Sequence, residues 1–518
     1  MTRPWAEALA VVGERVAWVG RDDEAGAWIG PGTHVIDGGG RLALPGLTDS
    51  HFHLLLGART LGMVRLDDAA DLSEVQARLR ARAAATPGDG WILGRGWMYR
   101  LFASGEPVHR RILDAVVPDR PVYCTAFDGH TGWANTTALR LAGILEGAET
   151  GTRFSTVVMG ADGMATGELR EGVAMDLVRR HVPSLSEDAQ LELLRQALGN
   201  LAALGLTGVH NMDGDTWQLG LYRRLLERGE LTLRVLVPLS LKPGSDLAAI
   251  DAWAERARAE RDSWLRCGAV KLFIDGVVES KTALLLAPYA DGSGDLGTAN
   301  HEQEEFEELV ARADARGLQV FVHAIGDGAV RRTLDAFSAA ARRNGPRDAR
   351  HRVEHVELID PTDVARFVEL GAIASMQPAH ANFGLDEQNT WRRLSGPERW
   401  PWGFAWWRLR DAGVRLAFGS DWPVASPDPI HGMHVALNRQ SLGPGVPDQR
   451  VTLDDAIAGY TTWAAYAAHR DGELGRLAPG YLADLVLLDR DLYHLPVEAL
   501  GEARVALTVV GGAVVYER

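Results

Sequence analysis

Hydrophobic and polar residues follow a regular order from about residue 187 to residue 421. Stretches with the helical spacing of apolar positions lie at 187–204, 216–228, 246–260, 302–316, 328–343 and 361–369. Each is followed by a short apolar run that predicts a buried strand, and these runs lie at 207–210, 233–237, 269–274, 318–323, 351–355 and 372–377, with a last one at 414–421. With a further strand at 44–53, the pattern predicts eight strands alternating with helices. This favours an α/β fold of the (β/α)8 TIM barrel type over a doubly wound sheet.

Both ends of the chain show a different pattern, in which short β-rich pieces alternate with turn residues. We therefore expect a composite β-sandwich domain from both termini, made of residues 1–48 and 473–518. The barrel is expected to comprise residues 49–61 and 160–472. Residues 62–159 break the alternation of strand and helix, and their Gly, Trp and His content fits an inserted cap segment over a pocket. Aromatic packing inside the insert explains that content equally well.

Composition and charge exclude several classes of protein. The 518 residues carry a net charge of −15 without basic clusters, which argues against nucleic acid or an anionic membrane as a partner. No apolar run reaches the roughly 18 residues of a membrane span, and no secretory signal is visible, so we expect a cytoplasmic protein. The two cysteines, Cys124 and Cys267, lie far apart and predict neither a disulfide framework nor a thiolate zinc cluster.

Two histidines follow the first predicted barrel strand. His51 and His53 stand two residues apart, so on an extended strand their side chains point to the same side and can share a metal ion. The pair alone is weak evidence, because two such histidines are more often a polar rim than a ligand pair.

Further polar residues lie at or near the ends of other predicted strands. Together with the first pair they are His51, His53, Lys271, His323, His355 and Asp421. Each alone has an ordinary explanation as a buried histidine, a surface charge or a helix cap. The carboxyl ends of barrel strands meet at one face, however, so their occurrence on five strands predicts a metal site.

Lysine is rare in this chain, which makes its few lysines informative. Of the 54 basic residues only Lys242, Lys271 and Lys281 are lysines. Arginine cannot replace a lysine that must react as a neutral amine, because the guanidinium group stays protonated. A reactive amine therefore explains why a lysine stands at position 271.

Several sequence motifs together resemble one family of enzymes. They are LPGLTDSHFH, GRGW, DRPVY, DGH, TGELREG, VKLFIDG, VFVHAIGDGAV, RVEH, SMQPAH, FGSDWPV and GRLAPGYLADLVLLD. With these motifs, from about residue 5 to the end, the chain resembles the amidohydrolase superfamily, in its YtcJ-like branch that includes N-substituted formamide deformylases. Members of that branch usually begin with one more strand, so either the sandwich lacks a strand or the start is misassigned.

The resemblance implies a metal centre. By it, His51 and His53 bind the more buried ion, and His323 and His355 bind the more exposed one. Histidine with carboxylate-type ligands suits Zn2+, with Mn2+, Fe2+ or Co2+ able to compete.

The resemblance also implies how the reaction proceeds. Lys271 would be carboxylated by CO2 and bridge two ions, and Asp421 would contact the buried ion. Asp421 would also take a proton from the attacking water and pass it to the leaving nitrogen. Deaminases of this superfamily usually carry HxxE at the fifth strand, whereas here Gly326 follows three residues after His323. This speaks against a deaminase, and a hydrolase with a single metal ion stays open as an alternative.

Residues that contact the substrate are predicted with less support. Family positions near the pocket correspond to Asp128, His130, Asn135, Gln377 and His380. A structural role is an equally good explanation, because polar loop residues also build caps and turns. His210, at the end of the second predicted barrel strand, is a further candidate for the pocket.

The sequence therefore predicts a metal-dependent hydrolase that cleaves a non-peptide C–N bond, of the N-substituted amide or formamide type, in a small molecule. Hydrolysis of a carbamate, cyclic amide or ester is the alternative within the enzyme class. A metal-binding homologue without catalysis is the alternative outside it. A homodimer is compatible with this prediction.

Overall fold

The structure is a computed structural model of the whole chain. It describes residues 5–86, 88–102, 106–127, 129–151, 155–260, 262–381 and 389–518. The chain divides into two compact units, of which one comprises Met1–Leu55 and Leu194–Arg518 and the other Leu56–Leu193.

The first unit contains the predicted barrel. Eight of the described strands form one parallel sheet in the order β17-β16-β15-β14-β13-β12-β11-β4. Their bounds are β4 Leu47–Phe52, β11 Leu206–Asn211, β12 Arg234–Ser240, β13 Leu265–Phe273, β14 Gln319–Ala324, β15 Arg352–His355, β16 Ile373–Met376 and β17 Arg415–Phe418. Each predicted strand is present in sequence order, so the predicted (β/α)8 fold is confirmed.

The residues after β17 close the barrel onto β4. Asp421 donates its backbone N–H to the carbonyl of His51 at 2.7 Å, and His53 donates to the carbonyl of Trp422 at 2.9 Å. Phe52 and Trp422 form a parallel bridge at the same place. The closing hydrogen bonds therefore involve predicted metal ligands directly.

Helices cover the strands because each has one apolar stripe. In α10 (Asp327–Asn344), Val330, Leu334 and Phe337 lie three or four residues apart and are buried. Helix α8 (Leu247–Ala259) packs against β13, and α9 (Gln303–Ala315) and α10 pack against β14.

Side-chain caps fix where several of these helices begin. Asp215 accepts the backbone N–H of Gln218 at the start of α7 (Thr216–Glu227), and Asp246 accepts that of Ala248 at the start of α8. These caps set the lengths of the loops that follow the strand ends.

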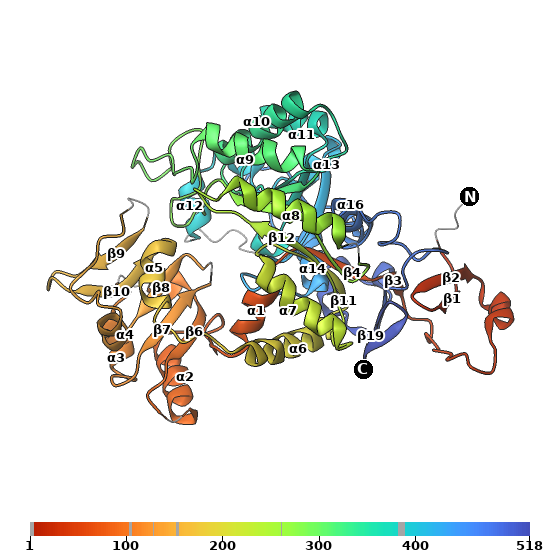
Figure 1. Cartoon of the computed structure of the whole chain (residues 1–518), viewed down its shortest axis with the longest axis horizontal. Helices are drawn as coiled ribbons and strands as arrows, with labels where there is room; N and C mark the ends of the chain where they lie inside the picture. The colour runs from red at the N-terminus through yellow and green to blue at the C-terminus, as the bar shows by residue number, and fades with distance from the viewer. Residues whose placement is uncertain are drawn as a thin grey trace. The chain divides into compact units, whose positions relative to one another are not determined.

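Both ends of the chain contribute antiparallel sheets to this unit (Figure 1). A hairpin consists of β1 (Ala8–Val12) and β2 (Arg15–Gly20). A four-stranded sheet has the order β20-β19-β18-β3, with bounds β20 Ala513–Glu517, β19 Val505–Val510, β18 Leu485–Leu488 and β3 Ala43–Pro45. Leu9 packs against a cluster of buried residues of β18 and β19, so the hairpin and the C-terminal strands share a core. Both termini therefore contribute antiparallel strands here, and the bounds 1–48 and 473–518 of a composite domain stay a prediction.

A buried ion pair attaches the C-terminal sheet to the barrel. Arg234, the first residue of β12, donates to both carboxylate oxygens of Asp484, at 2.6 and 2.9 Å. Both side chains are almost fully buried. Such a bidentate pair has well-defined geometry and fixes how the sheet meets the amino-terminal ends of the strands.

The second unit has its own mixed sheet, of order β5-β6-β7-β8-β10-β9. The strands are β5 Val64–Arg65, β6 Ile92–Trp97, β7 Val122–Ala126, β8 Thr131–Ala134, β10 Ala165–Arg170 and β9 Thr156–Met159. This unit ends at Leu193, beyond the limit of 159 expected from the sequence, because β10 and α5 (Glu171–Arg179) pack with the other strands of the insert.

Among the described residues, no helix combines the length and the apolar character that crossing a membrane needs.

Candidate metal centre

The predicted ligands meet at the carboxyl ends of the barrel strands. Asp421 Oδ1 lies 3.1 Å from His53 Nε2 and 3.4 Å from His51 Nε2. These three groups have their ligand atoms within 4.8 Å of one another, which is close enough for one ion. His51 is completely buried, so the site lies inside the barrel mouth.

A second set of ligands shares Asp421 with the first. His355, His380 and Asp421 also have ligand atoms within 4.8 Å of one another. The ring of His355 lies 4.6 Å from that of His51 and 4.4 Å from that of His323, measured between centroids. The structure therefore brings four predicted histidine ligands together and adds His380, which the sequence suggested only as a substrate contact.

Three of the histidines have their Nδ1 atoms bound to an oxygen. His51 Nδ1 lies 2.7 Å from Glu354 Oε2, and His53 Nδ1 lies 2.8 Å from Asp213 Oδ1. His355 Nδ1 lies 2.8 Å from Gln377 Oε1. A carboxylate or amide oxygen can only accept, so each Nδ1 donates, and in the neutral ring Nε2 then carries the lone pair that a metal ion needs. Metal-binding histidines in proteins are oriented in this way.

His323 is held by a backbone group instead. Its Nε2 lies 3.1 Å from the carbonyl oxygen of Gly276, a residue in the loop after β13. Asp275 Oδ1 is 3.7 Å from the same nitrogen. Contact with a backbone carbonyl is another common way of orienting a ligand histidine.

Sequence reasoning missed the acidic residues that orient the ligands. Glu354 is completely buried, and burial alone would raise its pKa, but Arg352 and His51 lower the pKa to about 2. A signal was present, because Arg352 and Glu354 stand two apart on a predicted buried strand and so point to the same side. A buried charge is costly unless an opposite charge pairs with it, so two opposite charges that face the interior indicate a buried ion pair. Asp213, two residues beyond β11, carried no comparable signal.

Lys271 is buried without a hydrogen-bond partner among the described residues. Its Nζ lies 4.2 Å from the centre of the Phe273 ring. Burial lowers the pKa of Lys271 to about 8, although Glu354 and Asp421 act in the opposite direction. A substantial neutral fraction is therefore present near neutral pH, as a reactive amine requires.

The backbone is strained where the ligands leave their strands. His355 has a φ of 75°, the next residue Val356 has a φ of 49°, and Asp421 has a φ of 60°. These are left-handed values, which are costly for non-glycine residues and above all for a β-branched one. The surrounding fold holds these residues in place, and the strain coincides with the ligand cluster.

Two of the predicted substrate contacts, His380 and Gln377, lie at this cluster. His380 belongs to it, and its Nε2 lies 3.9 Å from Asp421 Oδ2. Gln377 is buried and bound to His355, so it orients a ligand. His130 lies in the insert and is 2.9 Å from Glu171, and Asp128 lies outside the described residues. Substrate contact stays a prediction for these residues.

Asn135 has its side chain fully engaged inside the insert. Its Oδ1 accepts the N–H groups of Val122 and Ala138, the latter as the N-cap of α4 (Thr136–Leu141). Its Nδ2 donates to the carbonyls of Val117 and Arg120. These four hydrogen bonds indicate a structural role.

We expect Asn135→Ala to destabilise the chain by about 2–4 kcal/mol, because a helix cap is lost and buried backbone groups lose partners. Urea unfolding measures the change, and KM should stay within about twofold of the unchanged chain. Thr137→Ala in the same helix, whose hydroxyl donates to the Pro118 carbonyl in an exposed position, is the control. A raised KM with unchanged stability would favour substrate contact.

His210 does not join the ligand cluster. Its Nδ1 lies 2.9 Å from Arg352 Nη1, and the residue lines a separate cavity at the other ends of the strands. The prediction that it faces the pocket with the metal ligands is therefore wrong. His51 and His323 also stand one position before the ends of β4 and β14, so the different depth of His210 comes from the stagger between strands.

Comparison with known proteins places the chain in a family. The profile of the "Amidohydrolase family" matches residues 34–516. An N-substituted formamide deformylase of Arthrobacter pascens is 30% identical over 535 residues, covering 99% of this chain and 95% of the relative. Protein LONG AFTER FAR-RED 3 of Arabidopsis thaliana is 32% identical over 529 residues, covering 99% of this chain and 89% of the relative.

A solved structure agrees with these relatives. The crystal structure of an uncharacterized metal-dependent hydrolase from Pyrococcus horikoshii OT3 superimposes with a TM-score of 0.75 at 25% identity, covering 94% of each chain. The residues 34–516 matched by the family profile include the eight barrel strands and all the predicted metal ligands. The chain therefore belongs to the amidohydrolase family and is a metal-dependent hydrolase.

Proposed function

We propose that the chain hydrolyses the C–N bond of an N-substituted amide or formamide at a centre of two divalent ions, with zinc as the preferred metal. Water supplies the hydroxyl group of the released acid, and its remaining proton goes to the nitrogen of the released amine. The observation that carries this proposal is the cluster of nitrogen and carboxylate ligands around Asp421.

The residues present fit divalent ions. His51 Nε2, His380 Nε2 and Lys271 Nζ are buried and have no hydrogen-bond partner among the described residues. Buried polar atoms without partners are rare in folded proteins. Two ligand sets share Asp421, which supports two neighbouring ions, and imidazole with carboxylate oxygen suits Zn2+. Such ions lower the pKa of a bound water from 15.7 to about 7 and polarise a carbonyl group.

Asp421 is the residue that moves the proton in this proposal. Burial would raise its pKa, but His51 and His53 lower the pKa well below the usual range, so the group is a carboxylate at neutral pH. It takes a proton from the attacking water and delivers it to the leaving nitrogen. If His323 and His355 hold the second ion, His380, whose Nε2 lies 3.9 Å from Asp421 Oδ2, is free to contact the substrate carbonyl.

Lys271 acts in this proposal as a carboxylated bridge. Its neutral Nζ bonds to the carbon of CO2 and releases one proton, which leaves a carboxylate where an amine stood. The burial of Lys271 and its lack of a partner support this role. The alternative is a single ion with Lys271 as a cation that faces the substrate.

The substrate class rests on the relative from Arthrobacter pascens, whose printed name is N-substituted formamide deformylase. Carbamates, cyclic amides and esters share the same reacting carbonyl and are the alternatives. We propose a small-molecule substrate and a cytoplasmic location. Release of amine from a panel of N-formyl and N-acyl amines, compared with matched carbamates, lactams and esters, distinguishes these classes.

Metal content per chain and the native intact mass with bicarbonate present test the centre itself. We expect about two ions per chain, since two ligand sets are present, and an added mass of one CO2 that disappears in Lys271→Met. Lys242→Met, at an exposed lysine, is the matched control and should keep the added mass. One ion together with an unmodified Lys271 would contradict the bridging role.

A further inference from the structure

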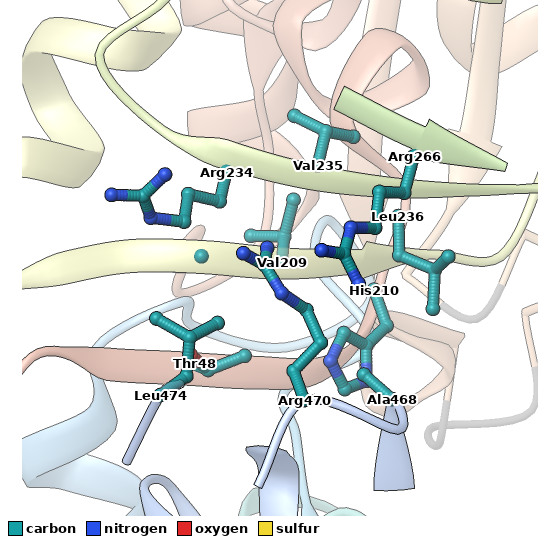
Figure 2. A pocket seen from close by; sticks show the side chains of 11 residues that line it. Thr48, Val209, His210, Arg234, Val235, Leu236, Arg266, Ala468, Arg470 and Leu474 are labelled. Carbon is teal, nitrogen blue, oxygen red and sulfur yellow. The ribbon is translucent and has the colours of Figure 1, made fainter. Parts of the chain in front are cut away.

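A small cavity lies at the amino-terminal side of the barrel, away from the ligand cluster. It has a volume of about 30 Å³ and is lined by residues of β4, β11, β12 and β13 and of the segment after α16 (Thr462–Ala467). Figure 2 shows the guanidinium groups of Arg266 and Arg470 pointing toward each other across it, with His210 beside them. A cavity of this size holds one or two water molecules or one small ion.

The charges around the cavity do not balance. Three guanidinium groups line it, those of Arg234, Arg266 and Arg470, and none of the described residues that line it is acidic. Arg234 is matched by Asp484, which it contacts through two nitrogens. Asp484 therefore neutralises the charge of Arg234, and the charges of Arg266 and Arg470 remain.

Arg266 and Arg470 share a single carboxylate. Arg266 Nη2 and Arg470 Nε each lie 2.8 Å from the same oxygen, Oε1 of Glu473. Burial, and then the charge of Arg266, lower the pKa of Arg470 to about 10, so it remains charged at neutral pH. The cavity therefore keeps one positive charge in excess.

Arg470 also has a donor without an acceptor. The residue is only 7% exposed, and its Nη2 is buried with no hydrogen-bond partner among the described residues. An unsatisfied charged donor in the interior costs more than a neutral one, so an acceptor at this place would be stabilising.

His210 adds a second donor to the lining. Arg352 Nη1 can only donate, so His210 Nδ1 accepts at 2.9 Å. Burial and the nearby Arg352 lower the pKa of His210 well below its usual value, so the ring is neutral and its proton is on Nε2. The lining therefore presents N–H donors from a charged and a neutral group.

We propose that this cavity binds one small monovalent inorganic anion, of which chloride is the most common in solution, between Arg470 and His210. The anion neutralises the excess charge and accepts from Arg470 Nη2. The side chain of Arg266 is 32% exposed, which gives the anion a way in from solvent. Arg234 and Arg266 lie near the starts of their strands, away from the ligand cluster, whereas His210 contacts Arg352, the ion-pair partner of Glu354.

Bromide, which replaces chloride and scatters anomalously, tests occupancy in crystals of the metal-loaded protein. We expect an anomalous peak between Arg470 and His210. In solution, replacing gluconate by chloride at constant ionic strength should raise Tm along a saturating curve, by about 1–2 °C at chloride tenfold above Kd. A cavity that contains only water, with equal Tm in chloride and gluconate, would overturn the proposal.

Arg470→Met should abolish the chloride-dependent rise in Tm. Arg439→Met is the matched control, because Arg439 is equally buried but donates to the carbonyls of Phe404 and Gly403. Both variants lose some stability, and only Arg470→Met should lose the response to chloride. Equal responses in the two variants would contradict the proposal. If Arg470→Met does not fold, the bromide measurement on the unchanged chain still decides.

Discussion

Asp421→Asn is expected to lower kcat/KM by about 10²–10⁴-fold, the usual contribution of general acid–base catalysis. The amide is nearly the same size as the carboxylate but cannot take up a proton near neutral pH. The backbone N–H of Asp421, which donates to His51 and closes the barrel, is unchanged by the substitution. Folding should therefore be preserved, and the loss should be confined to turnover.

Metal content separates the role in proton transfer from a role in metal binding alone. We expect Asp421→Asn to retain metal, because the histidine ligands and their orienting partners are untouched. Asp448→Asn, at an exposed carboxylate paired with Arg450, controls for the exchange of Asp for Asn and should keep full activity. Unchanged turnover in Asp421→Asn would remove Asp421 as the proton carrier.

Glu354→Gln is expected to have the second largest effect, and it should lower both the stability of the fold and the affinity for metal. It leaves Arg352 buried without its carboxylate, which costs about 3–5 kcal/mol for a buried ion pair. It also replaces the anionic acceptor of His51 Nδ1 by a neutral amide oxygen, which should weaken metal binding by about 10–100-fold. Urea unfolding and a competition assay with a chelator measure the two effects.

Two further variants make the result for Glu354 interpretable. Glu308→Gln removes a carboxylate from an exposed pair with Arg343 and should cost less than about 1 kcal/mol. Adding Arg352→Met to Glu354→Gln should recover part of the lost stability, because the unpaired charge is gone, but should not recover metal affinity. Recovery of both would mean that Glu354 does not orient His51.

The barrel, and the meeting of the predicted ligands at one of its faces, could be predicted from sequence for a physical reason. Buried parallel strands are continuous apolar runs, and their carboxyl ends meet at one face, so polar residues such as His323 and Lys271 stand out against the run that precedes them. The residues that orient the ligands were harder to predict. Asp213 contacts His53 only because two strands lie side by side, and sequence spacing does not report that contact.

The depth at which a strand side chain lies inside the barrel was the least predictable feature. His210 and His323 both occupy late positions in apolar strands, yet His210 faces the inner cavity and His323 joins the ligand cluster. The difference depends on the stagger between neighbouring strands, including an irregular register between β11 and β4. Register is set by packing of the whole sheet, so one strand's sequence does not determine it.

The closure of the barrel through Asp421 has a consequence for biosynthesis. The first and last barrel strands, which contribute His51 and Asp421, are far apart in the sequence, and contacts of such separation form late because the intervening chain must be ordered first. A nascent or truncated chain that lacks the last strand therefore holds an incomplete ligand set. Tight metal uptake should report that folding has finished, and the cell would load only completed enzyme.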